Sequence, residues 1–471
     1  MTYTTSNTIT DERSFASLAL REELLNNLGF LGYEQMMSVQ ALSLPLMLQE
    51  HDVIAQAKTG SGKTAAFGLA LLNRLNIQNY VVQALVLCPT RELAEQVCQA
   101  LRKLARLLPN VKVLNLSGGI PIKVQLDSLK HSPHIIVGTP GRVQKHLDKG
   151  SLSLSTLQTL VLDEADRMLD MGFFDAISGI IKACPKPRLT LLFSATFPAE
   201  IKALSRQFMQ HPKTVIVEED NSAVPDIEQI FYQAKNRANK YAVLKTLLLH
   251  YKPTSTIIFC NTKEQTNQLL DTLLDDGFSA TALNGDMEQV ERDMAMIRFK
   301  NQSCAILVAT DVAARGLDIK ELPAVINYDL AFEHDVHIHR IGRTGRAGSK
   351  GLALNIVTPA DVNRLTAIED GLQETASLRN VASLPISDDV APAPSMVTLR
   401  LNIGRKEKIR PGDILGALSK DAGLPGDSIG KIDIGALYSY VAVHQDQVDD
   451  AVKYFRNGKI KNCKVTVKRL D

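Results

Sequence analysis

The sequence offers little that would cross-link the chain or anchor it in a membrane. Its six cysteines are scattered and include no Cys-x-x-Cys pair, so neither a disulfide framework nor a zinc site is expected, and a reducing compartment fits. Residues 1–11 are polar and lack the apolar segment of a secretory leader. No apolar run approaches the length of a membrane span. These absences predict a cytoplasmic protein.

Net charge is also small, at +2 for 471 residues, but it is unevenly distributed. Residues 396–471 hold 14 Lys and Arg against 9 Asp and Glu, a local net charge of about +5. The remaining residues carry about −3. A basic C-terminal segment suggests an anionic partner. The overall composition, 45% hydrophobic and 22% charged, is that of a globular protein with several domains.

Short apolar runs alternate with helical patterns along most of the chain. After a helical stretch at 14–48, the first set of predicted strands is 53–57, 84–88, 111–116, 134–137, 160–162 and 189–193. The pattern lapses at 211–227, which we interpret as a linker, and the second set is 256–260, 279–283, 305–309, 324–328 and 352–357. Strands that alternate with helices predict parallel sheets with helices on both faces, and such sheets bind ligands at the carboxyl ends of their strands.

Beyond a second linker, the pattern changes to the order βαββαβ. The predicted strands are 397–403, 429–434, 437–443 and 463–470, and the predicted helices are 414–420 and 448–455. This order is typical of ferredoxin-like domains and RNA-recognition motifs. We therefore predict an α/β protein with a disordered N-terminus, two parallel-sheet domains, a linker and a small C-terminal domain, at residues 1–13, 14–212, 213–384, 385–395 and 396–471.

Two adjacent carboxylates, Asp163 and Glu164, follow the predicted strand at 160–162. Burying such a pair is costly, because each charge loses hydration and raises the pKa of the other. The pair is therefore expected where a cation or a reacting water compensates for it. One carboxylate can hold Mg²⁺ while the next positions the attacking water in phosphoryl transfer. A solvated turn after the strand is the alternative interpretation.

A glycine-rich loop follows the first predicted strand. Glycines let backbone N–H groups wrap around phosphate oxygens, the loop lysine reaches the β- and γ-phosphates, and the following hydroxyl binds Mg²⁺. The loop consists of Ala57, Lys58, Thr59, Gly60, Ser61, Gly62, Lys63 and Thr64. Ala57 departs from the usual first glycine, and a plain glycine-rich turn is the alternative. With the two carboxylates about a hundred residues further on, the loop makes nucleoside triphosphate hydrolysis the leading hypothesis.

Seven segments in a fixed order extend this hypothesis. They are AKTGSGKT at 57–64, PTRELA at 89–94, TPGR at 139–142, DEAD at 163–166, SAT at 194–196, ATDVAARGLDI at 309–319 and HRIGRTGR at 339–346. Together they resemble the motif set of the DEAD-box RNA helicases, and the resemblance covers residues 15–360. It implies an ATP-dependent RNA helicase with two RecA-like domains that close over ATP and RNA. The βαββαβ segment that follows is predicted from its own pattern to be an RRM-like RNA-binding domain.

The resemblance also implies roles for single residues. Gln40 would read the adenine edge, with Phe15 and Tyr33 packing nearby, although the threonine that usually supports this glutamine is Met37 here. The remaining nucleotide and coupling residues implied are Lys63, Asp163 with Thr64 for Mg²⁺, Glu164 for the attacking water, Ser194 and Thr196 for coupling hydrolysis to strand separation, Asp318 for the ribose, and Arg343 and Arg346 for the γ-phosphate.

The arginines also have a physical reason that is independent of the family. Charge on the phosphoryl oxygens in the transition state needs a cation, and an arginine finger is worth roughly 10³–10⁵ in rate. Placing Arg343 and Arg346 on a second domain would make hydrolysis depend on domain closure. A basic nucleic-acid-binding loop is the alternative for this segment.

RNA contacts implied by the resemblance are glycines, hydroxyl groups and arginines at strand ends. Such groups suit sugar and phosphate, which carry no sequence information. Taken singly, each is more often a plain turn or a helix cap. The residues are Pro89, Thr90, Arg91, Gly118, Gly119, Thr139, Pro140, Gly141, Arg142, Thr262, Gln289 to Arg292, Thr310 and Gly316.

The C-terminal domain is the candidate for target choice, because the core contacts would read only the backbone. Tyr438 and Tyr440 should share one face of a strand, where a stacked base is worth about 1–3 kcal/mol. Arg405, Lys406 and Lys408 form a basic loop that could follow phosphates. Ordinary strand tyrosines and a solvated charged face are the alternatives.

Segments 410–418 and 429–432 resemble the C-terminal domain of one bacterial branch of the DEAD-box family. That resemblance implies a helicase directed to a hairpin of large-subunit ribosomal RNA during assembly of the large ribosomal subunit, acting on pre-ribosomal particles, with ATP and Mg²⁺ as cofactors. No feature suggests a coiled coil, so a monomer is expected. An ATP-gated RNA clamp without productive unwinding is the main alternative, and a DNA helicase is the less favoured one.

Overall fold

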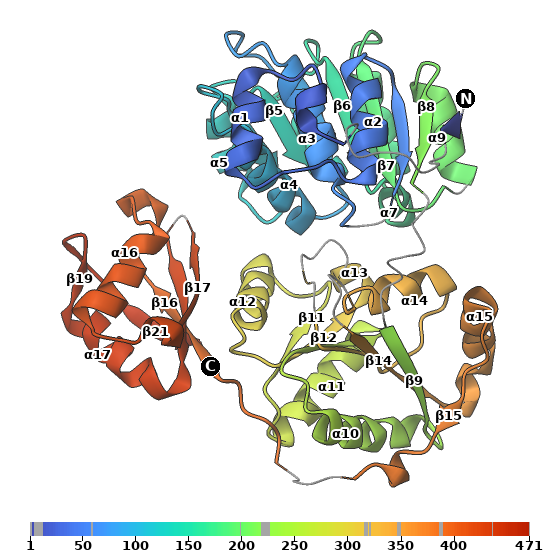
Figure 1. Cartoon of the computed structure of the whole chain (residues 1–471), viewed down its shortest axis with the longest axis vertical. Coiled ribbons are helices and arrows are strands. Elements are labelled where there is room, and N and C mark those ends of the chain that lie inside the picture. Colours follow the sequence, from blue (N-terminus) through green and yellow to red (C-terminus); the bar gives the residue numbers. More distant parts are fainter. Residues whose placement is uncertain are drawn as a thin grey trace. The chain divides into compact units, whose positions relative to one another are not determined.

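The structure is a computed structural model of the chain. It describes residues 2–3, 13–57, 60–197, 199–217, 227–314, 319, 322–345, 350–385, 390–435 and 437–470. Within these residues the chain forms two compact bodies, one ending before residue 218 and one beginning at residue 227. Each body is built around a parallel sheet (Figure 1).

The first body holds a parallel sheet with the strand order β1-β8-β2-β7-β6-β3-β5-β4. Its strands are β1 (Thr2–Tyr3), β2 (Val53–Gln56), β3 (Ala84–Leu87), β4 (Val113–Leu116), β5 (Ile135–Gly138), β6 (Thr159–Asp163), β7 (Leu189–Ser194) and β8 (Lys213–Ile216). Its helices are η1 (Phe15–Ser17), α1 (Glu22–Phe30), α2 (Ser38–Leu48), α3 (Lys63–Arg74), α4 (Arg91–Leu104), α5 (Ile122–Leu129), α6 (Pro140–Asp148), α7 (Ala165–Asp170), α8 (Phe174–Lys182) and α9 (Ala199–Phe208).

The central strands of this sheet are apolar because helices cover both faces. Val53 and Ala55 point into one hydrophobic cluster, and Ile54 between them points into the other. Each cluster is closed by helices, with Leu69 of α3 in the first and Ile180 of α8 in the second. Alternation along a strand therefore fills two cores at once, which explains why the runs are continuously hydrophobic.

All six strands predicted for the first domain are present within one or two residues of their predicted bounds. Two predictions were wrong. Lys213–Ile216 lie in the stretch that we interpreted as a linker, yet they form β8 and pair with Val53–Gln56, so the first body continues beyond the boundary at residue 212. Thr2–Tyr3 lie in the segment expected to be disordered, yet they form β1 beside β8.

The second body contains another parallel sheet, with the strand order β11-β12-β10-β13-β14-β9-β15. Its strands are β9 (Ile227–Gln233), β10 (Thr256–Cys260), β11 (Ala280–Leu283), β12 (Ile306–Thr310), β13 (Ala324–Asn327), β14 (Gly351–Val357) and β15 (Leu378–Arg379). Its helices are η3 (Arg237–Asn239), α10 (Lys240–Tyr251), α11 (Lys263–Asp275), α12 (Gln289–Lys300), α13 (Asp311–Ala314), α14 (His334–Ile341), η4 (Pro359–Asp361), α15 (Val362–Leu372) and η5 (Val381–Ser383).

The five strands predicted for this domain are all present, but β9 was missed. It pairs with β14 over seven residues and lies next to the edge strand β15. Its sequence, Ile-Glu-Gln-Ile-Phe-Tyr-Gln, mixes polar and apolar residues because part of the strand borders solvent. A strand in this position lacks the continuous apolar run by which its buried neighbours were recognised.

The C-terminal domain has an antiparallel sheet with the strand order β17-β18-β16-β21. Its strands are β16 (Met396–Leu401), β17 (Ile429–Ile434), β18 (Ser439–His444), β19 (Lys459–Ile460), β20 (Cys463–Lys464) and β21 (Val467–Leu470). Its helices are η6 (Arg405–Glu407), α16 (Pro411–Gly416), η7 (Ala417–Asp421), η8 (Gly426–Ser428), η9 (Gln445–Gln447) and α17 (Val448–Asn457). The βαββαβ order is thus confirmed, and with it the predicted fold class (Figure 1).

Candidate functional site

The glycine-rich loop lies between β2 and α3, the position that the sequence predicted. Gly60 and Gly62 have φ angles of 92° and 90°, in the left-handed region that favours glycine. A Cβ atom at Gly62 would lie 2.5 Å from the Gln40 side chain, so the close packing also requires glycine there. Ala57 and Ser61 lie in the loop, Thr64 is the second residue of α3, and Lys58 and Thr59 lie outside the described residues.

Lys63 is the first residue of α3 and is only 6% exposed. Its ammonium group donates a hydrogen bond of 2.9 Å to the carbonyl oxygen of Ala57 across the loop. The charge is therefore held at the centre of the turn, where oxygens of a phosphate chain would replace the carbonyl as partner.

Gln40 is fixed by two hydrogen bonds that need no particular neighbouring side chain. Its Oε1 accepts from the backbone N–H of Met37 at 2.8 Å, and its Nε2 donates to the carbonyl oxygen of Gly62 at 3.1 Å. The methionine at position 37 therefore leaves the glutamine supported through the backbone. Phe15 is buried and makes an edge-to-face contact with the half-exposed ring of Tyr33, 6.1 Å between centroids.

Asp163 ends β6 and is 3% exposed. Within the described structure its Oδ1 is buried and has no hydrogen-bond partner. Burial raises the pKa of Asp163 above its ordinary value, Lys63 opposes the rise, and Glu164 adds to it. A buried acceptor without a partner is costly. The chemistry of the residues therefore fits Mg²⁺, which commonly takes only one or two protein ligands in phosphate sites.

Glu164 occupies an unusual backbone conformation at the start of α7. Its φ is 53°, a left-handed value that costs a residue with a side chain about 1–2 kcal/mol. Its carboxylate accepts a hydrogen bond of 2.7 Å from Arg167, and both side chains are about 5% exposed. The two adjacent carboxylates therefore differ, because Glu164 is paired with Arg167 whereas the Oδ1 of Asp163 has no partner among the described residues.

Asp166 links the DEAD segment to the end of β7. Its Oδ2 accepts hydrogen bonds from the backbone N–H of Ala195, from the backbone N–H of Thr196 and from the Thr196 hydroxyl, at 3.1, 2.9 and 3.0 Å. Its own N–H donates to Ser194 Oγ at 3.3 Å. Burial raises the pKa of Asp166, but the hydrogen bonds from Thr196 and its neighbours outweigh burial and lower it overall.

The arginine segment of the second body contains a closed polar network. Arg340 is 1% exposed, and its guanidinium donates to both carboxylate oxygens of Asp311 at 2.6 and 2.7 Å, to Asn261 at 2.8 Å, and to Asn327 at 3.1 Å. Arg340 therefore holds the ends of β10, β12 and β13 together and is unavailable to nucleic acid. Arg343 follows α14 and is also buried, whereas Arg346 and Asp318 lie outside the described residues.

The RNA-contacting residues predicted in the first body gather at one edge of its sheet. Pro89–Arg91 follow β3, Gly118–Gly119 follow β4, and Thr139–Arg142 follow β5, and these three strands are neighbours. Gly119 has a φ of 81°. The side of Gly141 that would carry a Cβ atom faces open space. The phosphate loop, at the end of β2, lies on the opposite side of β6 in the strand order.

Two arginines, Arg91 and Arg142, lie near each other at this edge. A Cβ atom at Gly118 would lie 2.6 Å from the Arg91 guanidinium, so Arg91 lies over the glycine turn. Arg142 donates to the carbonyl oxygen of Ile120 at 2.8 Å and to Gln125 at 2.6 Å, which holds the turn in place. Burial and the neighbouring Arg91 lower the pKa of Arg142, a combination that a bound phosphate would relieve.

In the second body, Thr262 follows β10, and Thr310 is the last residue of the adjacent strand β12. Thr262 caps α11 by accepting from the N–H of Gln265 at 3.2 Å. Arg292, in the first turns of α12, donates to the carbonyl oxygen of Asn284 at 3.2 Å. Gly316 lies outside the described residues.

In the C-terminal domain, β18 begins only at Ser439, so Tyr438 precedes the strand, contrary to the prediction. Tyr438 is 42% exposed and stacks on Arg400, with 4.9 Å between the guanidinium and the ring centroid. Tyr440 pairs with Arg400 across the strands and is half-buried.

The basic loop of this domain, Arg405, Lys406 and Lys408, is exposed. Gly435 accepts the backbone N–H of Arg405 at 2.9 Å and donates its own N–H to Tyr438 at 2.8 Å. The loop and Tyr438 therefore lie at the same end of the sheet, where a basic and an aromatic surface meet.

Comparison with known proteins decides the family. Residues 37–204 match the DEAD/DEAH box helicase model, residues 239–348 the helicase conserved C-terminal domain, and residues 398–469 the DbpA RNA binding domain. The chain is 50% identical to the ATP-dependent RNA helicase DbpA of Escherichia coli (strain K12), over 94% of this chain and 96% of that protein. The chain belongs to the DbpA branch of the DEAD-box RNA helicases.

Two further relatives agree. DbpA of Bacillus subtilis (strain 168) is 38% identical over 97% of this chain and 99% of that protein. The structure of Saccharomyces cerevisiae Dbp5 bound to RNA and ADP BeF3 superposes with a TM-score of 0.71 at 32% identity, over 78% of this chain and 96% of that one. As a DEAD-box enzyme, the protein is an ATP-dependent RNA helicase with an RNA-binding domain. None of its described helices is long and apolar enough to cross a membrane.

Sequence reasoning missed the residues that hold the DEAD-box site together. Asp166 received no separate role, and Arg167 and Arg340 were not singled out as internal partners. A charged residue three positions after Glu164 on a helix is a signal for the Arg167 contact. The bonds from Asp166 to β7 and from Arg340 to three strands depend on the sheet order, which the sequence does not encode locally.

Proposed function

We propose that this DEAD-box helicase remodels ribosomal RNA during assembly of the large ribosomal subunit, acting as a cytoplasmic monomer directed to a hairpin of large-subunit RNA. The observation that carries the proposal is the C-terminal domain, whose sequence matches an RNA-binding domain and whose basic loop meets an exposed tyrosine. The first two domains offer turns and arginines suited to backbone contact, so choice of target must come from elsewhere.

The ATP step uses the edge around Asp163 in the first domain. Lys63 binds the β- and γ-phosphates, Asp163 and Thr64 would hold Mg²⁺, and Glu164 accepts a proton from the attacking water. When bound, Mg²⁺ neutralises charge on the phosphate oxygens. The buried Oδ1 of Asp163, which has no partner among the described residues, supports its place in this scheme. Gln40 reads adenine, and Asp318 contacts the ribose.

Arg343 and Arg346 complete the site only when the second domain closes over ATP. Their cations would meet the charge that develops on the γ-phosphate. Ser194 and Thr196 then transmit the state of the site, because their bonds to Asp166 join the end of β7 to the carboxylate segment. RNA held by both domains would be bent out of duplex geometry, which separates the strands locally.

The decisive experiment measures ATP hydrolysis in the presence of total ribosomal RNA, fragments of the large-subunit RNA, and unrelated RNA. We expect the strongest stimulation from fragments that contain the target hairpin. Equal stimulation by unrelated RNA would overturn the ribosomal assignment while leaving the helicase intact. Deletion of residues 396–471 should abolish the preference and leave a weak, unselective ATPase.

An ATP-gated RNA clamp remains the second candidate because the same motifs serve both activities. The presence of Glu164 and Arg343 favours turnover over simple clamping. A duplex-release assay with ATP separates the two. RNA-stimulated hydrolysis without strand release would establish the clamp.

A further inference from the structure

A pocket in the second body has no role in the scheme above. It has a volume of about 470 Å³ and lies at the carboxyl ends of β9, β10, β13 and β14. These strands are neighbours in the sheet, and this edge is where parallel sheets bind ligands. Thr262, one of the proposed RNA-contacting residues, is part of its wall.

The floor of the pocket is formed by a buried ion pair whose two charges neutralise each other. Lys240 donates a hydrogen bond of 2.6 Å to Asp329, and both side chains are at most 10% exposed. The other oxygen of Asp329 accepts the N–H of Asn261 at 3.0 Å. Since the buried carboxylate is already paired, the charge that a ligand would meet comes from the rim.

The rim is basic and carries an exposed aromatic ring. Lys235 and Arg237 are exposed, and Arg237 donates only to a neutral group, the Gln265 amide, at 3.2 Å among its described bonds. Phe332 is 62% exposed, and the Arg364 guanidinium lies 4.2 Å from the centroid of its ring. An exposed ring backed by a guanidinium is a surface on which a nucleobase stacks.

The surrounding helices favour the same ligand charge. Lys240 begins α10, Thr262 caps α11, and Thr358–Asp361 lead into α15, and all of these residues line the pocket. Three helices of eleven to thirteen residues therefore start at the pocket, each with its positive dipole end there. The lining has four cationic and two anionic side chains, a net charge of +2.

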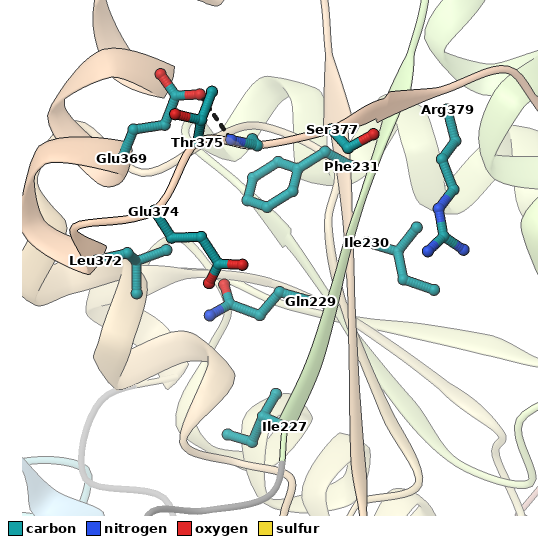
Figure 2. A pocket seen from close by; sticks show the side chains of 11 residues that line it. Ile227, Gln229, Ile230, Phe231, Glu369, Leu372, Glu374, Thr375, Ser377 and Arg379 are labelled. Carbon is teal, nitrogen blue, oxygen red and sulfur yellow. Dashed lines mark hydrogen bonds between the residues drawn. The ribbon is translucent and has the colours of Figure 1, made fainter.

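A second pocket on the same sheet provides the contrast. It has a volume of about 350 Å³ and lies against β9 and the end of α15. Figure 2 shows Glu369 and Glu374 on one side of it and Arg379 on the other. Its charged residues sum to −1, and Glu369 is engaged with the N–H of Ala376 at 2.8 Å. This acidic pocket offers neither a cationic rim nor an exposed aromatic ring backed by arginine.

We propose that the pocket between Lys235 and Phe332 binds one nucleotide of single-stranded RNA adjacent to the RNA segment held at Thr262. Lys235 and Arg237 bind the phosphate, and the base stacks on Phe332 with Arg364 behind the ring. The site adds one nucleotide to the length of RNA that the second domain contacts. This inference rests on the proposed RNA role of Thr262.

The test uses the full-length chain and single-stranded RNAs lengthened one nucleotide at a time at either end. Phe332→Ala should leave binding of the shortest RNAs unchanged and weaken binding of the longer ones by about tenfold, as expected for loss of one stacked base. Phe332→Tyr should restore the affinity. Phe174→Ala, which removes an exposed phenylalanine from α8 of the first body, is the matched control and should behave as wild type.

Charge at the rim is tested separately. Lys235→Ala with Arg237→Ala should reduce the salt dependence of binding by about 0.7 for each phosphate that the variant no longer binds, again only for the longer RNAs. Arg379→Ala, in the acidic pocket, is the control and should leave the slope unchanged. RNA carrying 5-iodouridine at the added position should cross-link to the peptide that contains Phe332.

The outcomes separate this inference from the proposed function. Wild-type protein without RNA-stimulated ATPase would refute the function itself. Normal RNA-stimulated ATPase, with Phe332→Ala binding every RNA length as wild type does, would refute only the pocket. A third outcome is that AMP quenches a fluorophore attached at the pocket while the effect of Phe332→Ala shows no dependence on RNA length. That result would assign the pocket to free nucleotide and overturn the RNA assignment.

Discussion

In both parallel-sheet bodies, polar residues lie at the carboxyl ends of the strands. The two bodies differ in how completely these residues are hydrogen-bonded. In the first body, the buried Asp163 Oδ1 has no partner among the described residues, Glu164 has a left-handed backbone, and Gly60 and Gly62 hold an unusual turn. In the second body, the guanidinium of Arg340 is bonded to one carboxylate, two amides and a carbonyl oxygen.

This difference shows how one architecture serves two purposes. Unsatisfied polar groups and backbone strain are retained where a ligand will satisfy them. A fully bonded network, such as that of Arg340, instead fixes the ends of β10, β12 and β13 relative to one another. In the proposed function, the first edge is the reaction site and the second is the scaffold that would present Arg343.

The comparison is tested most strongly at Glu164. Glu164→Gln keeps the shape of the side chain but removes the base, so we expect ATP turnover to fall by about 10²–10⁴-fold while ATP and RNA binding persist. Steady-state ATPase and equilibrium binding measure the two effects. Glu23→Gln, on the exposed face of α1, is the control. Near-normal turnover in Glu164→Gln would remove this residue from the reaction.

The scaffold is tested at Arg340. Arg340→Met leaves the buried face of Asp311 without its partner, and breaking a buried ion pair in this way costs about 3–5 kcal/mol. Urea unfolding should therefore show strong destabilisation of the second body. Arg379→Met, at an exposed site in the same body, should leave stability unchanged. Equal stability of the two variants would contradict the role of the network.

Acid should weaken the second body through His337. Burial, followed by Arg340 and His334, lowers the pKa of His337 to about 3. In the unfolded chain the histidine has a pKa of about 6.5, so between about pH 6.5 and 3 it binds a proton that the folded protein does not bind. The contribution of neutral His337 to the free energy of unfolding is therefore complete above about pH 6.5 and is lost as the pH falls toward 3.

At pH 5 the loss should be about 2 kcal/mol relative to neutral pH, measured by urea unfolding. His337→Gln should remove that part of the pH dependence, whereas His131→Gln, at an exposed site, should keep it. An unchanged slope in His337→Gln would show that other groups carry the acid sensitivity.

The smallest expected effect concerns the C-terminal domain. Alanine at Arg405, Lys406 and Lys408 should lower the salt dependence of RNA binding by roughly one unit for each phosphate that the loop no longer binds. Titration of RNA binding over a range of salt concentrations measures the slope. Alanine at Lys103, an exposed residue at the end of α4, is the control. A slope equal to that of wild type would exclude the loop from the RNA-binding surface.

The sequence predicted the sheets well because their strands are buried on both faces. Eleven apolar runs, from Val53 to Val357, became strands. β9 was missed because it lies near a sheet edge and is partly polar, and β8 because it follows a polar stretch. A continuous apolar run identifies a strand that is buried on both faces, and β8 and β9 lack such a run.

Candidate site residues could be predicted from the sequence where they form a local motif, but not where they depend on contacts between distant segments. The loop at Gly60–Lys63 and the pair Asp163–Glu164 are readable from neighbouring residues. The bonds of Asp166 to Thr196 and of Arg340 to Asp311 join segments far apart in sequence, so only the fold reveals them. The roles assigned to the site residues and the remaining domain boundaries stay predictions.

The hydrogen bond between Gln40 and Gly62 makes the residue proposed to read the base and the phosphate loop one mechanical element. A nucleotide that orders the loop through its phosphates also sets the position of Gln40. Preference for adenine should therefore grow with the number of phosphates, from weak for nucleosides to strongest for triphosphates. The enzyme would then ignore adenosine and discriminate among bases only in molecules that carry the phosphates it hydrolyses.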